Sequence, residues 1–225
     1  MKLSPQTVVP SALLTAILAL LTATFPGTAT AATVITGGTE GTSSTSRYGG
    51  GFTHATDFTS TTAQQINALG FWDSGANGLG TGFSYTVGLW ETSSQTLLES
   101  VTISNADALD PSLTVAGGQW RYETIPTVSL TSGKTYTMGF YTPLDMSPDD
   151  SLFLDSTVTT ASTVSIINQF DFLASTVLTF PTNFFPSVDH YYTQVNAKFV
   201  PEPGSAGLVT LGCLMLLGRR RKTKD

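Results

Sequence analysis

The chain has 225 residues, of which 40% are hydrophobic and only 12% charged, enough for one domain with its own core plus terminal tails. Residues 32–199 hold fourteen acidic residues and four basic ones, which are Arg47, Arg121, Lys134 and Lys198. The resulting net charge of −10 repels phosphate backbones and disfavours nucleic acid as a partner. The single cysteine, Cys213, excludes a disulfide within the chain.

Residues 1–31 are typical of a signal peptide for export. Lys2 supplies a positive start, residues 8–25 are uncharged and rich in Leu and Ala, and Pro-Gly then precedes small residues. Ala29 and Ala31 fit the small-x-small rule of signal peptidase, which predicts a signal helix followed by a cut before Ala32. An uncleaved membrane helix is the alternative.

Residues 32–51 form a lead-in to the main domain. The run from Gly37 to Gly51, "GGTEGTSSTSRYGGG", is of low complexity. Such Gly-, Ser- and Thr-rich sequence lacks the apolar side chains that a packed core needs, so we expect a flexible segment or a long loop here.

Residues 52–199 are predicted to form one all-β domain. Ser and Thr make up 50 of the 168 residues from 32 to 199, and residues typical of helix surfaces are scarce. Apolar residues alternate with period two at 83–91, 96–104, 134–142 and 194–200, the pattern of half-buried strands. Parallel pairing would require crossover helices, so we predict an antiparallel, jelly-roll-like β-sandwich of nine or ten strands.

Part of this domain resembles a known type. The pattern consists of Leu69–Asp73, a Gly-rich loop, Val87–Trp90, Leu97–Ser100 and Leu130–Tyr136. In this order it resembles a β-sandwich domain of unknown function found in secreted bacterial proteins. The resemblance implies a fold and no activity.

Residues 200–225 form a tail of different composition. Pro201, Glu202 and Pro203 impose an extended, helix-free start. The next fifteen residues, 204–218, carry no charge; as a helix they would span about 22 Å, less than a bilayer core of about 30 Å. A basic cluster that prefers the cytoplasmic side follows, made of Arg219, Arg220 and Arg221. We therefore expect a short C-terminal transmembrane helix.

This tail resembles the PEP-CTERM sorting signal, the exosortase recognition segment of exported Gram-negative proteins. The resemblance implies that an exosortase, a membrane protease, acts near Pro201-Glu202-Pro203. It also implies an inner-membrane intermediate, followed by delivery to the cell surface or release, and an association with exopolysaccharide.

The sequence offers few candidates for catalysis. It has no Gly-x-Ser-x-Gly motif, and residues 32–199 have no cysteine. His54 near Asp57, and His190 beside Asp189, are predicted to be surface histidines at strand edges. Glu99 falls on the apolar side of a strand, which predicts an edge position or a bulge. We therefore predict no catalytic residues and no enzyme.

Calcium is the one cofactor alternative. Asp73 and Asn77 lie on a Gly-rich loop, and Asp149 and Asp150 are adjacent, so both places offer the oxygen ligands that Ca²⁺ prefers. Ordinary turn chemistry explains the same residues. We expect no bound metal or other cofactor, and name these four residues as the calcium candidates.

Aromatic side chains could instead mark a sugar-binding surface. The candidates for stacking on sugar rings are Trp72, Trp90, Trp120, Tyr48, Tyr141, Tyr191 and Tyr192. Trp90 and Trp120 lie in strands with alternating partners, so we predict that they belong to the core or its rim.

The sequence as a whole predicts an exported, non-enzymatic protein of the cell surface or extracellular matrix. Its expected partners are signal peptidase, exosortase, the membrane transiently through the C-terminal helix, and exopolysaccharide. A carbohydrate-binding module is the first alternative, and an unrecognised secreted hydrolase is the second.

Overall fold

The computed structural model describes residues 31–39, 51–112, 117–142, 157–185 and 194–201. Contacts divide the chain into one unit from Ala31 to Val200 and another that joins Met1–Thr30 to Pro201–Asp225. The predicted signal helix and C-terminal helix fall outside the described residues. Within the described ranges, no helix is long and apolar enough to cross a membrane.

In the described part of the first unit, the regular secondary structure consists of β-strands, without a helix. Its strands are β1 (Ile35–Thr39), β2 (Phe52–Ser60), β3 (Gln64–Ser74), β4 (Tyr85–Glu91), β5 (Thr96–Ile103), β6 (Ala108–Leu109), β7 (Gly118–Leu130), β8 (Thr135–Thr142), β9 (Thr157–Thr160), β10 (Val164–Ala174), β11 (Asn183–Phe185) and β12 (Val195–Phe199). The predicted all-β class is confirmed. The short strands β6 and β11, of two and three residues, are too brief to produce an alternating pattern in the sequence.

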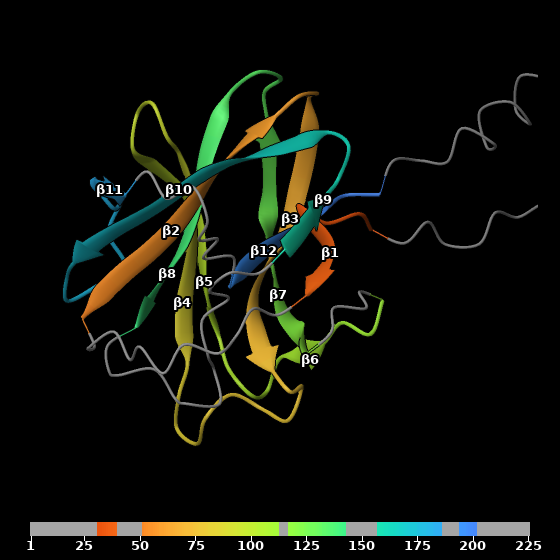
Figure 1. Cartoon of the computed structure of the whole chain (residues 1–225), viewed down its shortest axis with the longest axis vertical. Helices are drawn as coiled ribbons and strands as arrows, with labels where there is room; N and C mark the ends of the chain where they lie inside the picture. The colour runs from red at the N-terminus through yellow and green to blue at the C-terminus, as the bar shows by residue number, and fades with distance from the viewer. Residues whose placement is uncertain (1–30, 40–50, 113–116, 143–156, 186–193, 202–225) are drawn as a thin grey trace, which may run out of the picture. The chain divides into compact units, whose positions relative to one another are not determined.

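The strands form three sheets (Figure 1). One has the order β11-β10-β2-β8-β4-β5, a second has the order β12-β3-β7-β6, and β1 pairs with β9. All the pairings are antiparallel, as predicted. The successive strands β2 and β3 lie in different sheets, and so do β7 and β8, while β2 pairs with β8 and β3 with β7.

A shared apolar core joins the two larger sheets. Phe71 of β3 stacks on Tyr85 of β4 with 4.0 Å between ring centroids, and meets Phe140 of β8 edge-on at 5.1 Å. Alternate residues of β4 and β8 are buried in this core, as the period-two pattern predicts. Burying a side chain of this size contributes roughly 1.5–3 kcal/mol, so these strands hold the sheets together.

One predicted alternation is interrupted. The sequence places Leu97 and Glu99 on one side of a strand, but the register of β4 and β5 shifts there: Glu99 pairs with Leu89, and Leu97 pairs with Trp90. Leu97 is consequently 45% exposed. Since β5 is the edge strand of its sheet, Glu99 has the edge position next to a bulge that the sequence predicts.

Candidate functional site

A buried ion pair lies where β3 ends. Arg121 Nε of β7 donates to Asp73 Oδ2 at 2.8 Å, and the two side chains are 11% and 0% exposed. Arg121 is the register partner of Phe71 and therefore shares the face of the sheet that packs on the core. A charge buried there is stable only with a partner, which Asp73 provides.

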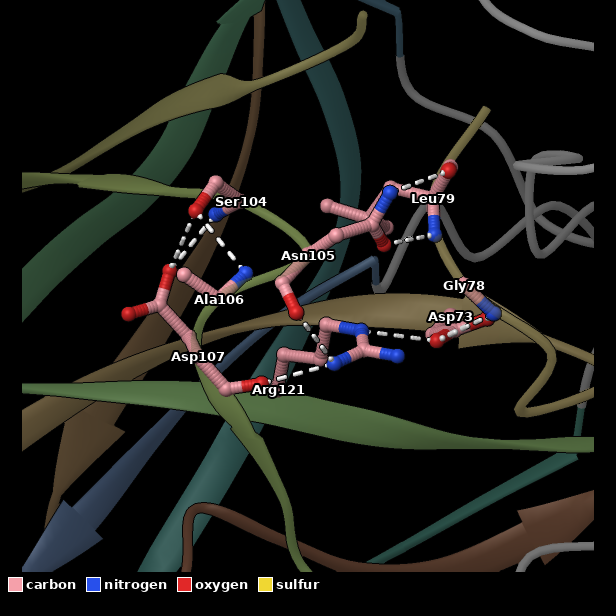
Figure 2. A network of polar contacts seen from close by, with 8 residues as sticks. All are labelled: Asp73, Gly78, Leu79, Ser104, Asn105, Ala106, Asp107 and Arg121. Atoms are coloured by element: carbon pink, nitrogen blue, oxygen red, sulfur yellow. Dashed lines mark hydrogen bonds and ion pairs between the residues drawn. The ribbon is translucent and has the colours of Figure 1, made fainter. Parts of the chain in front are cut away.

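The same guanidinium also fixes the connection between the two sheets. Arg121 Nη1 donates to the carbonyl oxygens of Asn105 and Asp107 at 3.3 and 2.7 Å (Figure 2). These residues belong to the turn between β5, in one sheet, and β6, in the other. One side chain thus ties the end of β3 to the crossover.

The loop between β3 and β4 is attached to that turn. The side chain of Asn105 donates to Leu79 O at 2.7 Å and accepts from Leu79 N at 2.6 Å. Gly78 N donates to the Asp73 carboxylate at 3.1 Å. Gly78 has a φ of +109°, and a Cβ there would lie 3.1 Å from Asn105 Oδ1, so this position requires glycine. We call Asp73, Gly78, Leu79, Ser104, Asn105, Asp107 and Arg121 the loop-end network.

Acidic and amide groups in this network and next to it reach the surface. Asp107 accepts hydrogen bonds from Ser104 N and Oγ at 2.6 and 3.2 Å. Asp107 also raises the pKa of Glu123, chiefly through a hydrogen bond that favours the protonated carboxyl group. Asn77 is exposed on the neighbouring loop. The arrangement can offer several donors and acceptors to a polar ligand from loops that are held in place.

The calcium candidates have different environments. The Asp73 carboxylate is occupied by Arg121 and Gly78, and a guanidinium at 2.8 Å repels a cation from it. Asn77 lies four residues after Asp73 in the sequence, but it is exposed to solvent, whereas Asp73 is buried. Asp149 and Asp150 lie outside the described residues. Among the residues that the structure places, no group of three or more His, Cys, Asp or Glu side chains could hold a metal ion.

The predicted surface position of His54 is wrong. His54 is buried on the core side of β2, between Phe140 at 5.4 Å and Phe52 at 5.9 Å between ring centroids. Burial lowers its pKa from 6.5 to about 4. Asp57 is three positions further along the strand and so lies on the opposite face, where Thr137 Oγ1 donates to it at 2.6 Å. His54 and Asp57 therefore form no catalytic pair; His190 and Asp189 lie outside the described residues.

All three tryptophans belong to the interior, as the sequence predicts for Trp90 and Trp120. Trp72, Trp90 and Trp120 are 0, 3 and 1% exposed. Trp72 and Trp120 meet edge-on with 4.5 Å between ring centroids, and Trp90 packs edge-on against Phe180 at 6.1 Å. None of the three is free to stack on a sugar. Tyr141 is half-buried, and the other tyrosine candidates, Tyr48, Tyr191 and Tyr192, lie outside the described residues.

The basic side chains of the described domain are each paired with an acid. Besides Arg121, Lys134 Nζ lies 2.6 Å from Glu91 Oε1, and Lys198 Nζ lies 2.8 Å from Asp110 Oδ2. Lys198 also lies 4.1 Å from the centre of the Tyr122 ring. These pairings neutralise the cations that an anionic ligand would need.

The predicted sorting motif begins after the last strand, with one residue between them. Val200 N donates to Gln65 O at 2.8 Å, and the next residue, Pro201, is exposed. Ala31 is half-buried at the start of the same unit. The remaining residues predicted for sorting and processing, Ala29, Glu202, Pro203, Arg219, Arg220 and Arg221, lie outside the described residues.

No protein-family model matches the chain, and no curated protein matches it. Among solved structures, a family 35 carbohydrate-binding module from an environmental isolate is 14% identical and has a TM-score of 0.29, covering 60% of this chain and 88% of its own. A family 35 module solved with a disaccharide containing glucuronic acid is 16% identical with a TM-score of 0.27, covering 61% of this chain and 93% of its own. TM-scores of this size carry no argument about ligand.

Proposed function

We propose that this chain is an exported, non-enzymatic protein whose domain binds a polysaccharide at the cell surface or in the extracellular matrix. The observation that carries the proposal is the loop-end network. Arg121 and Asn105 hold two loops by hydrogen bonds of 2.6–3.3 Å, next to the surface groups of Asn77, Asp107 and Glu123. Polar groups that are already ordered lose little entropy when they bind sugar hydroxyls.

The ligand that fits this surface is a neutral polysaccharide. Residues 32–199 carry a net charge of −10, which repels uronate- or phosphate-bearing polymers. In the described part of the domain, the three cations are each within 2.8 Å of a carboxylate oxygen. Sugar hydroxyls, in contrast, can use both carboxylate and amide groups.

Affinity electrophoresis of the mature protein in gels with neutral or anionic polysaccharides tests this proposal. We expect retardation by at least one neutral polymer, and at least tenfold weaker binding after Asn77→Ala with Glu123→Gln. The matched control is Asn183→Ala, an exposed asparagine on β11. No retardation by any neutral polymer, or equal loss with the control, would contradict the proposal.

The second candidate function concerns delivery: the tail is a substrate of an exosortase. Its support is the order of the triplet, the apolar run and the arginines, together with the exposed Pro201 immediately after β12. Replacing Pro201, Glu202 and Pro203 by Ala should retain an uncleaved precursor in the inner membrane. Pro111→Ala, at another exposed proline, is the control. Unchanged release of the triple variant would refute this function.

The finer architecture is also a proposal. The successive strands β2 and β3 lie in different sheets, where they pair with β8 and β7, which are also successive in the chain. This connectivity favours a jelly-roll-like β-sandwich. We place a signal helix before it and a short transmembrane helix after it. The intact mass of the mature protein from its native host reports both expected cuts. A mass that includes residues 1–31 would contradict signal-peptide cleavage, and a mass that includes residues 204–225 would contradict cleavage by an exosortase.

A further inference from the structure

The loop between β3 and β4 contains the one Asn-Gly pair of the sequence, Asn77-Gly78. The main-chain nitrogen of the residue that follows an asparagine can attack the side-chain amide carbon, and glycine hinders this attack least because it has no Cβ. The fold requires glycine at this position for a different reason. The φ of Gly78 is +109°, and a Cβ there would lie 3.1 Å from Asn105 Oδ1. Packing against Asn105 thus preserves a chemically reactive pair.

The amide of Asn77 is accessible for such a reaction. Asn77 is exposed, and no hydrogen bond to a described residue holds its side chain. Asn105 has the opposite environment, because its amide donates to Leu79 O at 2.7 Å and accepts from Leu79 N at 2.6 Å. These bonds also hold the main chain directly after Gly78. The attacking residue is therefore fixed, while the side chain that it would attack faces solvent.

A proton acceptor lies next to the attacking nitrogen. Gly78 N donates to both oxygens of the Asp73 carboxylate, at 3.2 and 3.1 Å (Figure 2). This nitrogen becomes a nucleophile only when its proton leaves, and a carboxylate within hydrogen-bond distance can take that proton. Asp73 is itself held in place, since its side chain is 0% exposed and Arg121 Nε lies 2.8 Å from Oδ2. The loop-end network thus positions a general base at the main-chain nitrogen that the reaction uses.

We propose that Asn77 is a site of spontaneous deamidation, in which Asp73 removes the proton from Gly78 N. Gly78 N forms a bond to Asn77 Cγ, the bond from Cγ to Nδ2 breaks, and the amide nitrogen leaves as ammonia with the proton that Asp73 carried. Water then opens the cyclic imide and produces aspartate or isoaspartate. The product adds one negative charge to the loop between β3 and β4. The proposal does not depend on polysaccharide binding, although both concern Asn77.

Peptide mapping of the mature protein after incubation at neutral pH tests the proposal. We expect aspartate and isoaspartate at position 77 to form at least tenfold faster than in a synthetic peptide of residues 70–84, because a positioned general base typically accelerates a reaction by about 10²–10⁴-fold. Asn183, which is exposed but followed by Phe184, is the control in the same molecule and should keep its amide. A rate at Asn77 that does not exceed the rate in the peptide would overturn the proposal.

The pH dependence of the rate tests the part assigned to Asp73. In the peptide, hydroxide removes the proton from the glycine nitrogen, so the rate should rise with pH. Carboxylates are ionised from about pH 6 to 8, so with Asp73 as the base the rate in the folded protein should change less than about twofold over this range. A parallel rise in the protein and the peptide would overturn the proposal.

A double variant removes the carboxylate without leaving the Arg121 guanidinium unpaired. Asp73→Asn with Arg121→Met should deamidate at Asn77 at least tenfold more slowly than the original chain, and urea unfolding shows whether the variant is folded. Lys134→Met, which breaks the exposed pair with Glu91, is the matched control and should leave the rate unchanged. An undiminished rate in a folded double variant would also overturn the proposal. If the double variant does not fold, the pH dependence of the original protein decides.

Discussion

Arg121→Met should strongly destabilise the domain, because it removes the guanidinium that lies 2.8 Å from the Asp73 carboxylate, whose side chain is 0% exposed. The variant keeps most of the apolar volume, but Asp73 loses its donor, and the carbonyl oxygens of Asn105 and Asp107 lose theirs. Removing one member of a buried pair costs about 3–5 kcal/mol. With a urea m-value of roughly 2 kcal/mol/M, the unfolding midpoint should fall by about 1.5–2.5 M.

Urea unfolding followed by fluorescence measures this loss, and a second ion pair provides the control. Lys134 and Glu91 lie closer together, at 2.6 Å, but their side chains are 49 and 24% exposed. Lys134→Met should therefore cost less than about 1 kcal/mol. Adding Asp73→Asn to Arg121→Met should restore part of the lost stability, because the carboxylate is then neutralised. Similar losses for Arg121→Met and Lys134→Met would refute the reasoning that burial, and not distance, sets the cost.

Three further results are expected. Gly139→Ala should cost about 1–3 kcal/mol in urea unfolding, because its Cβ would lie 2.5 Å from a backbone oxygen of the neighbouring strand. Gly37→Ala is the control: the nearest atom to its Cβ would be 3.9 Å away, so it should cost less than half as much. Equal losses for the two variants would contradict the clash at Gly139. Burial lowers the pKa of His54 from 6.5 in the unfolded chain to about 4 in the folded domain. Between these values the unfolded chain binds a proton that the folded domain does not. Stability is therefore fully present above pH 6.5, and up to about 3 kcal/mol of the unfolding free energy is lost as the pH falls to 4. His54→Asn should flatten the pH dependence of unfolding over that range, and an unchanged slope would argue against this account. Acrylamide should quench the fluorescence of the three buried tryptophans several-fold less in the folded than in the unfolded protein, and equal quenching would refute their burial.

The period-two pattern located the main strands because both large sheets bury one face in a shared core. In residues 134–142, Tyr136, Met138 and Phe140 alternate with polar or small residues, and all three are buried. Antiparallel pairing followed from the lack of helical patterns. The same argument could not predict the order of strands, because pairing partners such as β2 and β8 are separated by more than seventy residues.

The loop-end network was missed because its members are distant in sequence. Asp73 on a Gly-rich loop indicates a turn or a calcium ligand, and its partner Arg121 is 48 residues away. A weak signal existed: Arg121 is one of four basic residues in 32–199 and stands between Trp120 and Tyr122. For His54 the signal was its period-two spacing from Phe52 and Phe58, which places it on the core face in spite of its polarity.

The position of β12 has a mechanical consequence. Its bonds run to β3 on one side and to residues 32–34 on the other, and the chain leaves the domain at Pro201. A force that pulls on Pro201 along the axis of β12 loads both rows of hydrogen bonds at the same time. These hydrogen bonds lie across the direction of the force, so they must break together instead of one after another. In this shear geometry, β12 resists the tension.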